Sequence, residues 1–129
     1  MTARLVLLLA AVGLVPIALS YGLVPGRSVP FLLGFPVEGT NQSHVFRAIM
    51  GLYLTNAVFW LVATVKPELQ RPALWVLLLF MSGLAAGRLL SILIDGFPSG
   101  ILWFYLFAEL AFAALAATSL RREREIGCT

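Results

Sequence analysis

The residues in this sequence most able to do chemistry are Arg88 and Glu109, which lie inside long apolar stretches. A charged side chain in a membrane-spanning helix is costly unless it faces protein or water, so such residues are functional candidates by default. At about 1.5 Å per helical residue, Arg88 lies roughly 9 Å before the end of its stretch and Glu109 roughly 12 Å after the start of the next. The two stretches are joined by a short turn and must be antiparallel neighbours. We therefore predict an Arg88–Glu109 ion pair.

Further polar side chains occur in the same half of the apolar stretches. Arg88, Ser91 and Asp95 are spaced i, i+3 and i+7, which places them on one face of a helix. In an earlier stretch, Tyr53 and Asn56 follow Arg47 at helical spacing. The candidate site consists of Arg47, Tyr53, Asn56, Arg88, Ser91, Asp95 and Glu109.

Three interpretations of this cluster remain open. In the structural one, the pairs Arg88–Glu109 and Arg47 with Asp95 or Glu38 fix the order and orientation of the helices. In the functional one, the residues line an outward-facing pocket that binds a small anionic or polar ligand, or a lipid headgroup. The planar donor fork of arginine suits carboxylate and phosphate, which favours an anionic group. The third is a proton relay through Glu109, although nothing polar continues inward to complete its path.

Residues for catalysis or metal binding are scarce. His44 is the single histidine, so the chain holds no His pair or His–Cys set for a metal. It has no Ser-His-Asp set with supporting context, no phosphate-binding loop and no nucleotide fingerprint. Cys128 has no partner in the chain, and the few basic residues on an apolar chain do not form a nucleic-acid footprint. We expect no catalytic residues, cofactor, metal or nucleic acid, while a membrane enzyme using other groups is left open.

The elements that must position these residues are membrane spans. Hydrophobic residues make up 60% of the chain and charged residues 12%, whereas soluble domains carry about 25% charged residues. The apolar runs cover residues 5–24, 45–65, 72–94 and 101–120, and about 20 helical residues cross a hydrocarbon core. They lack the period-two alternation of barrel strands. The sequence predicts one all-α domain, residues 1–129, folded as an antiparallel four-helix transmembrane bundle.

Basic residues predict the direction of the spans. One side of the predicted membrane holds Arg4, Lys66, Arg71, Arg121, Arg122 and Arg124, and the other holds Arg27. By the positive-inside rule both termini are cytoplasmic, including a tail at residues 121–129. Interfacial anchoring explains the tryptophans and tyrosines in part. An alternative reads residues 1–20 as a cleaved signal peptide, but the run is longer than a usual signal core, which favours an uncleaved helix.

The connection at residues 25–44 contains three prolines and three glycines, which argue against a regular helix. We expect an interfacial loop whose apolar half lies at the membrane surface or over the bundle mouth; a solvated linker is the alternative. Its polar half should cap the second long helix through Ser43 or Asn41. Gly83-x-x-x-Gly87 suits close helix packing, and we expect it within the bundle more than between copies.

The chain also resembles a known family. The resemblance lies in the segment from Thr40 to Tyr53, the segment from Phe80 to Ser91, the turn Asp95-Gly96-x-Pro98, and Glu109. Together these are similar to the small bacterial membrane proteins grouped as a domain of unknown function, number four-three-four-five, over nearly the whole chain. The resemblance implies a bacterial four-helix inner-membrane protein and supplies no activity. It marks Arg47, Arg88, Ser91, Asp95 and Glu109 as matching positions.

From these observations we expect a non-enzymatic membrane protein with an outward-facing polar pocket, surrounded by membrane lipids and acting alone or as a homo-oligomer. One alternative is an accessory subunit of a larger membrane complex, which would dock through an apolar outer face. Another is a small oligomeric transporter or channel, which would need a continuous polar path.

Overall fold

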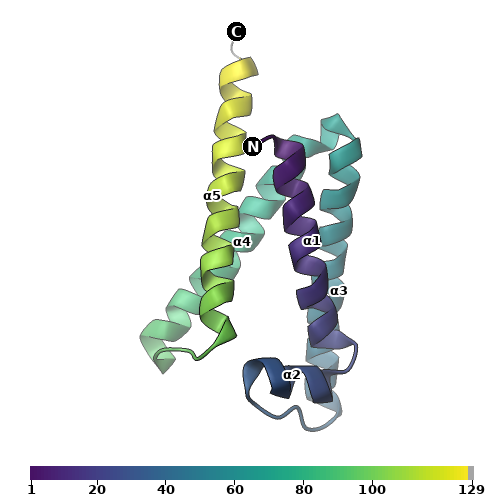
Figure 1. Cartoon of the computed structure of the whole chain (residues 1–129), viewed down its shortest axis with the longest axis vertical. Coiled ribbons are helices and arrows are strands. Elements are labelled where there is room, and N and C mark those ends of the chain that lie inside the picture. The colour runs from purple at the N-terminus through teal and green to yellow at the C-terminus, as the bar shows by residue number, and fades with distance from the viewer. Residues whose placement is uncertain (128–129) are drawn as a thin grey trace.

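The computed structural model describes the backbone of residues 1–127 and the side chains of residues 1–125. Five helices follow one another along the chain (Figure 1): α1 Ala3–Gly22, α2 Pro25–Leu33, α3 Thr40–Val65, α4 Pro67–Asp95 and α5 Ile101–Gly127. Four of them, all except α2, are long and apolar enough to cross a membrane. The predicted all-α bundle of four spans is therefore confirmed.

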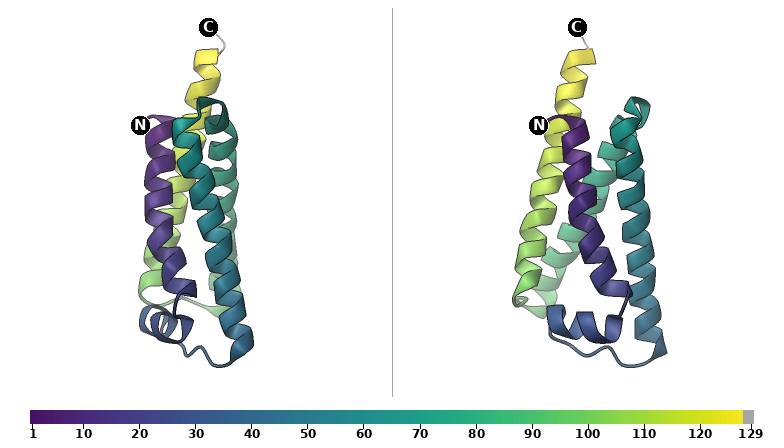
Figure 2. Two further views of the ribbon diagram at one scale, coloured as in Figure 1. Left: turned by 90° about the vertical axis from the view of Figure 1, so that its right-hand side faces the viewer. Right: turned by 45° about the vertical axis from the view of Figure 1, so that its right-hand side comes forward.

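The four long helices form two closely packed pairs. Helix α1 packs chiefly on α3, and α4 packs chiefly on α5, while α1 and α5 touch each other much less. The N-terminus and the last described turn of α5 lie at one end of the bundle, and the short α2 lies across the opposite end beside the α4–α5 turn (Figures 1 and 2). The arrangement leaves α1 and α5 as neighbours with a sparse contact between them.

Small residues allow the first helix pair to pack closely. Ala10, Ala11 and Ala18 of α1 are buried, as are Ala57 and Ala63 of α3. Small side chains let two helix backbones approach each other within a membrane. Large apolar side chains point outward instead, including Leu79, Leu93 and Phe107. This outward apolar surface is the one that lipid chains would cover.

One prediction about the loop at residues 25–44 is wrong, because part of this segment is helical. Pro25 stands in the first turn of α2, where its missing N–H is not needed. Gly34 then ends the helix in the left-handed conformation at φ 76°, which glycine adopts without a Cβ penalty. Within this helix Val29 is fully buried, whereas Phe31 points outward. The prolines and glycines therefore delimit a short helix instead of preventing one.

The start of α3 also differs from the prediction. The helix begins at Thr40, five residues earlier than the apolar run, and its N-cap is Gly39 at φ 86°. Neither Asn41 nor Ser43 is the cap, because both lie inside the first turn. The Gln42 side chain instead accepts a hydrogen bond from the backbone N–H of Glu38, which holds the preceding chain against the helix start.

The last two helices extend beyond their apolar runs. Helix α4 begins at Pro67, so Pro72 lies within it. Helix α5 continues past Leu120 to Gly127, and the charged segment that we expected as a tail is helical as far as the described chain reaches. Figure 1 shows this end of α5 projecting beyond the other helices. Cys128 lies outside the described residues.

Candidate functional site

An ion pair joins α4 to α5 near the end of the bundle where α2 lies. Nε of Arg88 donates to both carboxylate oxygens of Glu109, with 2.9 Å to each. The side chain of Glu109 is 8% exposed and that of Arg88 is 23% exposed. The pair that the sequence predicted is therefore present, and the arginine is its more accessible member.

The turn between α4 and α5 sets the register of this pair. Gly96 and Gly100 adopt φ values of 98° and 57°, which favour glycine because L side chains clash there. The indole Nε1 of Trp103 donates to the backbone oxygen of Pro98 at 2.9 Å. This bond closes the turn, and the two helices then run antiparallel with Arg88 opposite Glu109.

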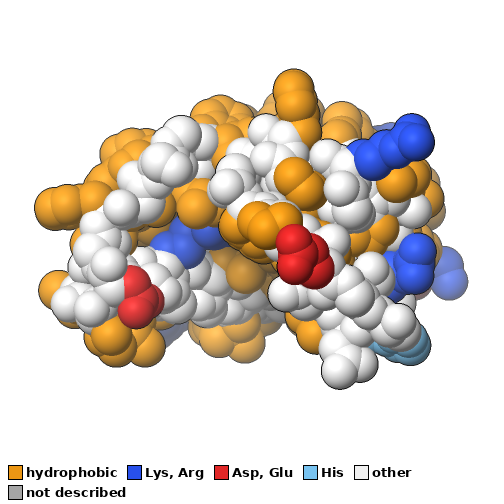
Figure 3. Space-filling model, turned by 90° about the horizontal axis from the view of Figure 1, so that it is seen from below, with side chains coloured by type: hydrophobic (Ala, Val, Ile, Leu, Met, Phe, Trp, Pro, Cys, Tyr) orange, Lys and Arg blue, Asp and Glu red, His pale blue; other side chains and the backbone are white. Residues whose placement is uncertain are grey.

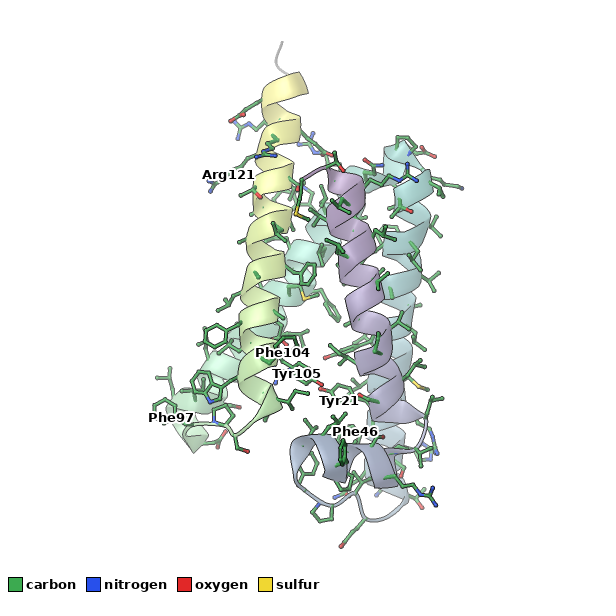
Figure 4. The ribbon with its side chains drawn as sticks, in the orientation of Figure 1. Tyr21, Phe46, Phe97, Phe104, Tyr105 and Arg121 are labelled. Carbon is green, nitrogen blue, oxygen red and sulfur yellow. The ribbon has the colours of Figure 1, made fainter. Side chains whose placement is uncertain are left out.

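Three buried tyrosines surround the ion pair. Tyr21 comes from α1, Tyr53 from α3 and Tyr105 from α5. The Tyr105 ring centroid lies 5.4 Å from Cζ of Arg88, within cation–π range. The rings of Tyr21 and Tyr53 are 5.9 Å apart. Figure 4 shows Tyr21 and Tyr105 reaching into the space between their helices.

Beside these side chains lies a cavity of about 150 Å³. Its charged lining is the Arg88–Glu109 pair, its polar tips are those of the three tyrosines, and most of the remaining wall is aliphatic or aromatic. The apolar part of the wall consists of Ala10, Gly13, Leu14, Ile17, Met81, Leu84, Phe104, Ala108 and Phe112. An apolar cavity of about 150 Å³ can hold a molecule the size of benzene. The space is therefore large enough for a small organic group.

The cavity is open at the bundle surface. Gly13 of α1 and Phe104 of α5 both line it and are both exposed. They belong to α1 and α5, which make only a sparse contact with each other. Figure 3, the view onto the α2 end, also shows basic side-chain atoms recessed in a hollow between the α4–α5 turn and α2. Both the side of the bundle and its α2 end thus give access to the site.

Ser91 lies on a different surface. It lines a groove of about 390 Å³ between α4 and α5, with Gly83 and Gly87 further along the same helix. A Cβ atom built on either glycine would meet nothing within 4 Å. The prediction that these glycines pack within the bundle is therefore wrong, because their face points outward. Arg88 lines this groove as well as the cavity.

The other predicted site residues are separate from the cavity, apart from Tyr53. Arg47 and Asp95 are exposed, and the described side chains contain no ion pair of Arg47 with either Asp95 or Glu38. Asn56 donates to the backbone oxygen of Leu52 in its own helix at 2.9 Å. The structure thus brings together three of the seven candidates, Tyr53, Arg88 and Glu109.

Sequence reasoning missed Tyr21 as a member of the site. Its position at the end of the first apolar run suggested an interfacial anchor, yet it is 6% exposed and faces the cavity. The signal available was its polar tip on a span that otherwise lacks charged residues. Tyr105 and Glu109 are four residues apart on α5 and so share one face of that helix, and the contact of Tyr105 with Arg88 follows from that spacing.

Chemically, the arrangement can recognise an oxygen acceptor in an apolar setting. Both hydrogen bonds to Glu109 come from Nε of Arg88, so the two Nη groups remain available to further acceptors. The carboxylate balances the guanidinium charge, which leaves the pair neutral as a whole. The site therefore offers hydrogen-bond donors without a net charge.

The fold and the site define a class: a small multi-pass α-helical membrane protein with a cavity between its spans. The chain belongs to the family described as Domain of unknown function (DUF4345), which it matches over residues 2–120. No curated protein and no solved structure matches it.

Proposed function

We propose that this protein binds a membrane-soluble small molecule through an oxygen atom that accepts hydrogen bonds from Arg88. The observation that carries the proposal is the position of the ion pair. The Arg88–Glu109 pair is not enclosed by packed protein on every side. It forms one wall of an open, mainly apolar cavity. Charged residues within membrane spans commonly mark substrate or ligand paths.

A neutral acceptor suits this site better than the anionic group suggested by arginine alone. Glu109 already compensates the charge of Arg88, and a second carboxylate or phosphate would face that glutamate in a medium of low dielectric, where like charges repel strongly. An ester carbonyl or a hydroxyl would accept from the Nη groups without this cost. We therefore assign the site to a neutral, oxygen-bearing group, such as the glycerol and ester part of a lipid.

The setting of the protein is part of the same proposal. We place it in a bacterial inner membrane, with both termini cytoplasmic. The proposed orientation is supported by the distribution of basic residues. All the basic residues of the predicted inner side lie at the end of the bundle that carries the N-terminus and the end of α5, and the positive-inside rule assigns such an end to the cytoplasm. In this orientation the cavity lies in the outer half of the membrane, beneath α2.

Binding of monooleoylglycerol provides the test. The protein would be reconstituted in phosphatidylcholine nanodiscs, and thermal unfolding would be followed by tryptophan fluorescence with and without the probe. A ligand at one hundred times its Kd stabilises a protein by about 2.7 kcal/mol, so we expect a rise of several degrees in Tm. The double variant Arg88→Gln/Glu109→Gln keeps an uncharged pair of similar size, and the rise should disappear in it.

The matched control is Gln70→Ala, which lies on α4 outside the cavity and the groove. This variant should respond to the probe as the unchanged protein does. Oleate supplies the anionic arm of the experiment. An equal rise in the double variant, or stabilisation by oleate alone, would refute the proposed recognition.

The roles of accessory subunit and of oligomeric transporter or channel stay predictions. Among the described side chains, the buried polar or charged residues are Glu109 and Ser119, which gives little support to a continuous polar path. Co-purification in mild detergent would test for a partner or a homo-oligomer, and flux into liposomes would test for transport.

A further inference from the structure

We infer that the ligand is a lipid that enters sideways from the bilayer, with the part of its hydrocarbon chain nearest the head between α1 and α5 and the rest of the chain among the bilayer lipids. This inference rests on the proposed function and adds to it the ligand class and the route of entry. It concerns the α1–α5 seam, which we define as the part of the cavity lined by Gly13 and Ile17 of α1 and by Phe104, Ala108 and Phe112 of α5.

The composition of the seam fits a chain. From Arg88 the cavity wall continues along α1 through Ile17 and Gly13, and along α5 through Ala108 and Phe112. None of these residues has a side-chain hydrogen-bond donor or acceptor for a polar group. On α1 the lining of the cavity runs from Ala10 to Tyr21, eleven residues apart and about 16 Å along a helix. The wall is therefore elongated parallel to the membrane normal, the direction in which an acyl chain lies.

The seam is also the place where the bundle is least closed. Helices α1 and α5 make only a sparse contact, whereas α1–α3 and α4–α5 are closely packed. Gly13 has no side chain, and a Cβ built on it would meet nothing within 4 Å. Phe104 on the opposite helix is 65% exposed. Both residues face lipid if the helices span a membrane, so a chain can slide between them without first leaving the bilayer.

The head of the same lipid would remain at the α2 end. The hollow in Figure 3 gives access to basic side-chain atoms from that end, and Arg88 lies beside the beginning of the seam. A lipid approaching along the membrane would thus keep its polar group near the surface and its chain within the hydrocarbon. No step requires a charged or polar group to cross the apolar half of the bundle.

Gly13→Leu tests the seam directly. Leucine favours helix and would enter open space, so the fold should be retained while the seam is filled. The matched control is Gly51→Leu, which lies on α3, is exposed, has equally open surroundings and lines neither the cavity nor the groove. The probe is a monoacylglycerol with a diazirine in its chain, incorporated into phosphatidylcholine nanodiscs, photolysed and mapped by mass spectrometry.

In the unchanged protein and in Gly51→Leu, we expect labelling at Ile17 and Phe112 that excess monooleoylglycerol competes away. In Gly13→Leu this labelling should fall by roughly tenfold, a change that marks a clear loss of affinity. Labelling at the outward-facing Leu79 should be unchanged and should not be competed. Glycerol monoacetate carries the same ester head without a long chain, and it should fail to compete.

Two results would overturn the inference while leaving the proposed function standing. One is competed labelling that depends on Arg88 but is unaffected by Gly13→Leu. The other is competition by glycerol monoacetate as strong as that by monooleoylglycerol. If instead no labelling is competed in the unchanged protein, the proposed function falls together with the inference.

Discussion

At the scale of single residues, Arg88 and Glu109 explain each other's presence in an apolar protein. Either charge alone would be stranded in a membrane span, whereas the two hydrogen bonds from Nε to the carboxylate allow both to remain. Because both bonds come from Nε, the Nη groups of the arginine can donate to other acceptors. One side chain can thus hold two helices together and recognise a ligand.

The cost of breaking this pair can be measured. Arg88→Ala leaves a buried carboxylate without a partner, and we expect it to lower the free energy of unfolding by about 3 kcal/mol. Glu109→Gln should cost less, because glutamine can still accept a hydrogen bond. The double variant Arg88→Ala/Glu109→Gln should be more stable than the sum of the two losses predicts. Thermal unfolding of the four proteins in one detergent gives the comparison, and strictly additive losses would contradict a coupled pair.

At this scale the sequence predicted the pair but not its surroundings. Two charges at similar depths in adjacent antiparallel spans have few other partners, so Arg88 and Glu109 could be matched from spacing. Arg47 and Asp95 could not be excluded in the same way, because helical spacing gives their face but not which face points inward. Tyr21 was missed since its contact with the site depends on how α1 crosses α3 and α5.

At the scale of elements, α1 and α3 make the most extensive helix contact, and they approach each other closely at Gly22. Gly22 is buried, and a Cβ added there would clash with the Met50 side chain, including its Cβ, close to the α3 backbone. The clash cannot be relieved by rotating the far end of the methionine alone. Gly22 is thus required where the two helices meet at the α2 end.

Gly22→Ala should therefore destabilise the protein, by about 1–3 kcal/mol as overpacking usually does. Its control is Gly13→Ala in the same helix, where the added methyl group meets nothing within 4 Å. Helix propensity alone should make the control slightly more stable, by up to about 1 kcal/mol. Parallel thermal unfolding would show this difference, and equal effects of the two changes would mean that α1 and α3 are not in close contact here.

The left-handed end of α2 gives a second prediction for an element. Gly34→Ala places a Cβ at φ 76°, which costs about 1–2 kcal/mol. The strain should unwind the last turn of α2, and hydrogen exchange at the amides of this helix should become faster. Gly26→Ala, in the first turn and free of neighbours within 4 Å, should slow exchange or leave it unchanged. Unaltered exchange in Gly34→Ala would show that α2 does not end at Gly34.

Helix ends were the least predictable feature of the elements. Apolar runs report where lipid would contact a helix, and α3, α4 and α5 all extend beyond them into polar residues. Helix α2, Pro25–Leu33, was predicted as a loop for a related reason. Proline and glycine are unfavourable in the middle of a helix but are accommodated in its first turn and at its end. In a helix as short as α2, most residues belong to the first or the last turn.

At the scale of the whole molecule, the described basic residues lie near the ends of the helices, apart from Arg47 and Arg88, which are each seven residues inside their helices. The proposed orientation is open to a direct test by cysteine labelling in a Cys128→Ser background. A membrane-impermeant maleimide should label Arg27→Cys in intact spheroplasts and Lys66→Cys only after lysis. The opposite labelling pattern would show that the protein has the inverse orientation, with the cavity in the inner half of the membrane.

Hydropathy sufficed for the architecture of the whole molecule, because runs of about 20 apolar residues have few alternatives to a helical span. It could not predict that the helices associate as two pairs with a seam between α1 and α5. That arrangement depends on the alanines shared by α1 and α3, on Gly22 against Met50, and on the Arg88–Glu109 pair that holds α5 to α4. The cavity is a consequence of this pairing.

The most direct test of ligand binding is native mass spectrometry of the protein extracted from its own membrane in mild detergent. We predict an adduct with the mass of a neutral, glycerol-based lipid on the unchanged protein, and its loss from the folded Arg88→Gln/Glu109→Gln variant. An unchanged protein without any lipid adduct, or a double variant that keeps the same adduct at the same occupancy, would contradict the account.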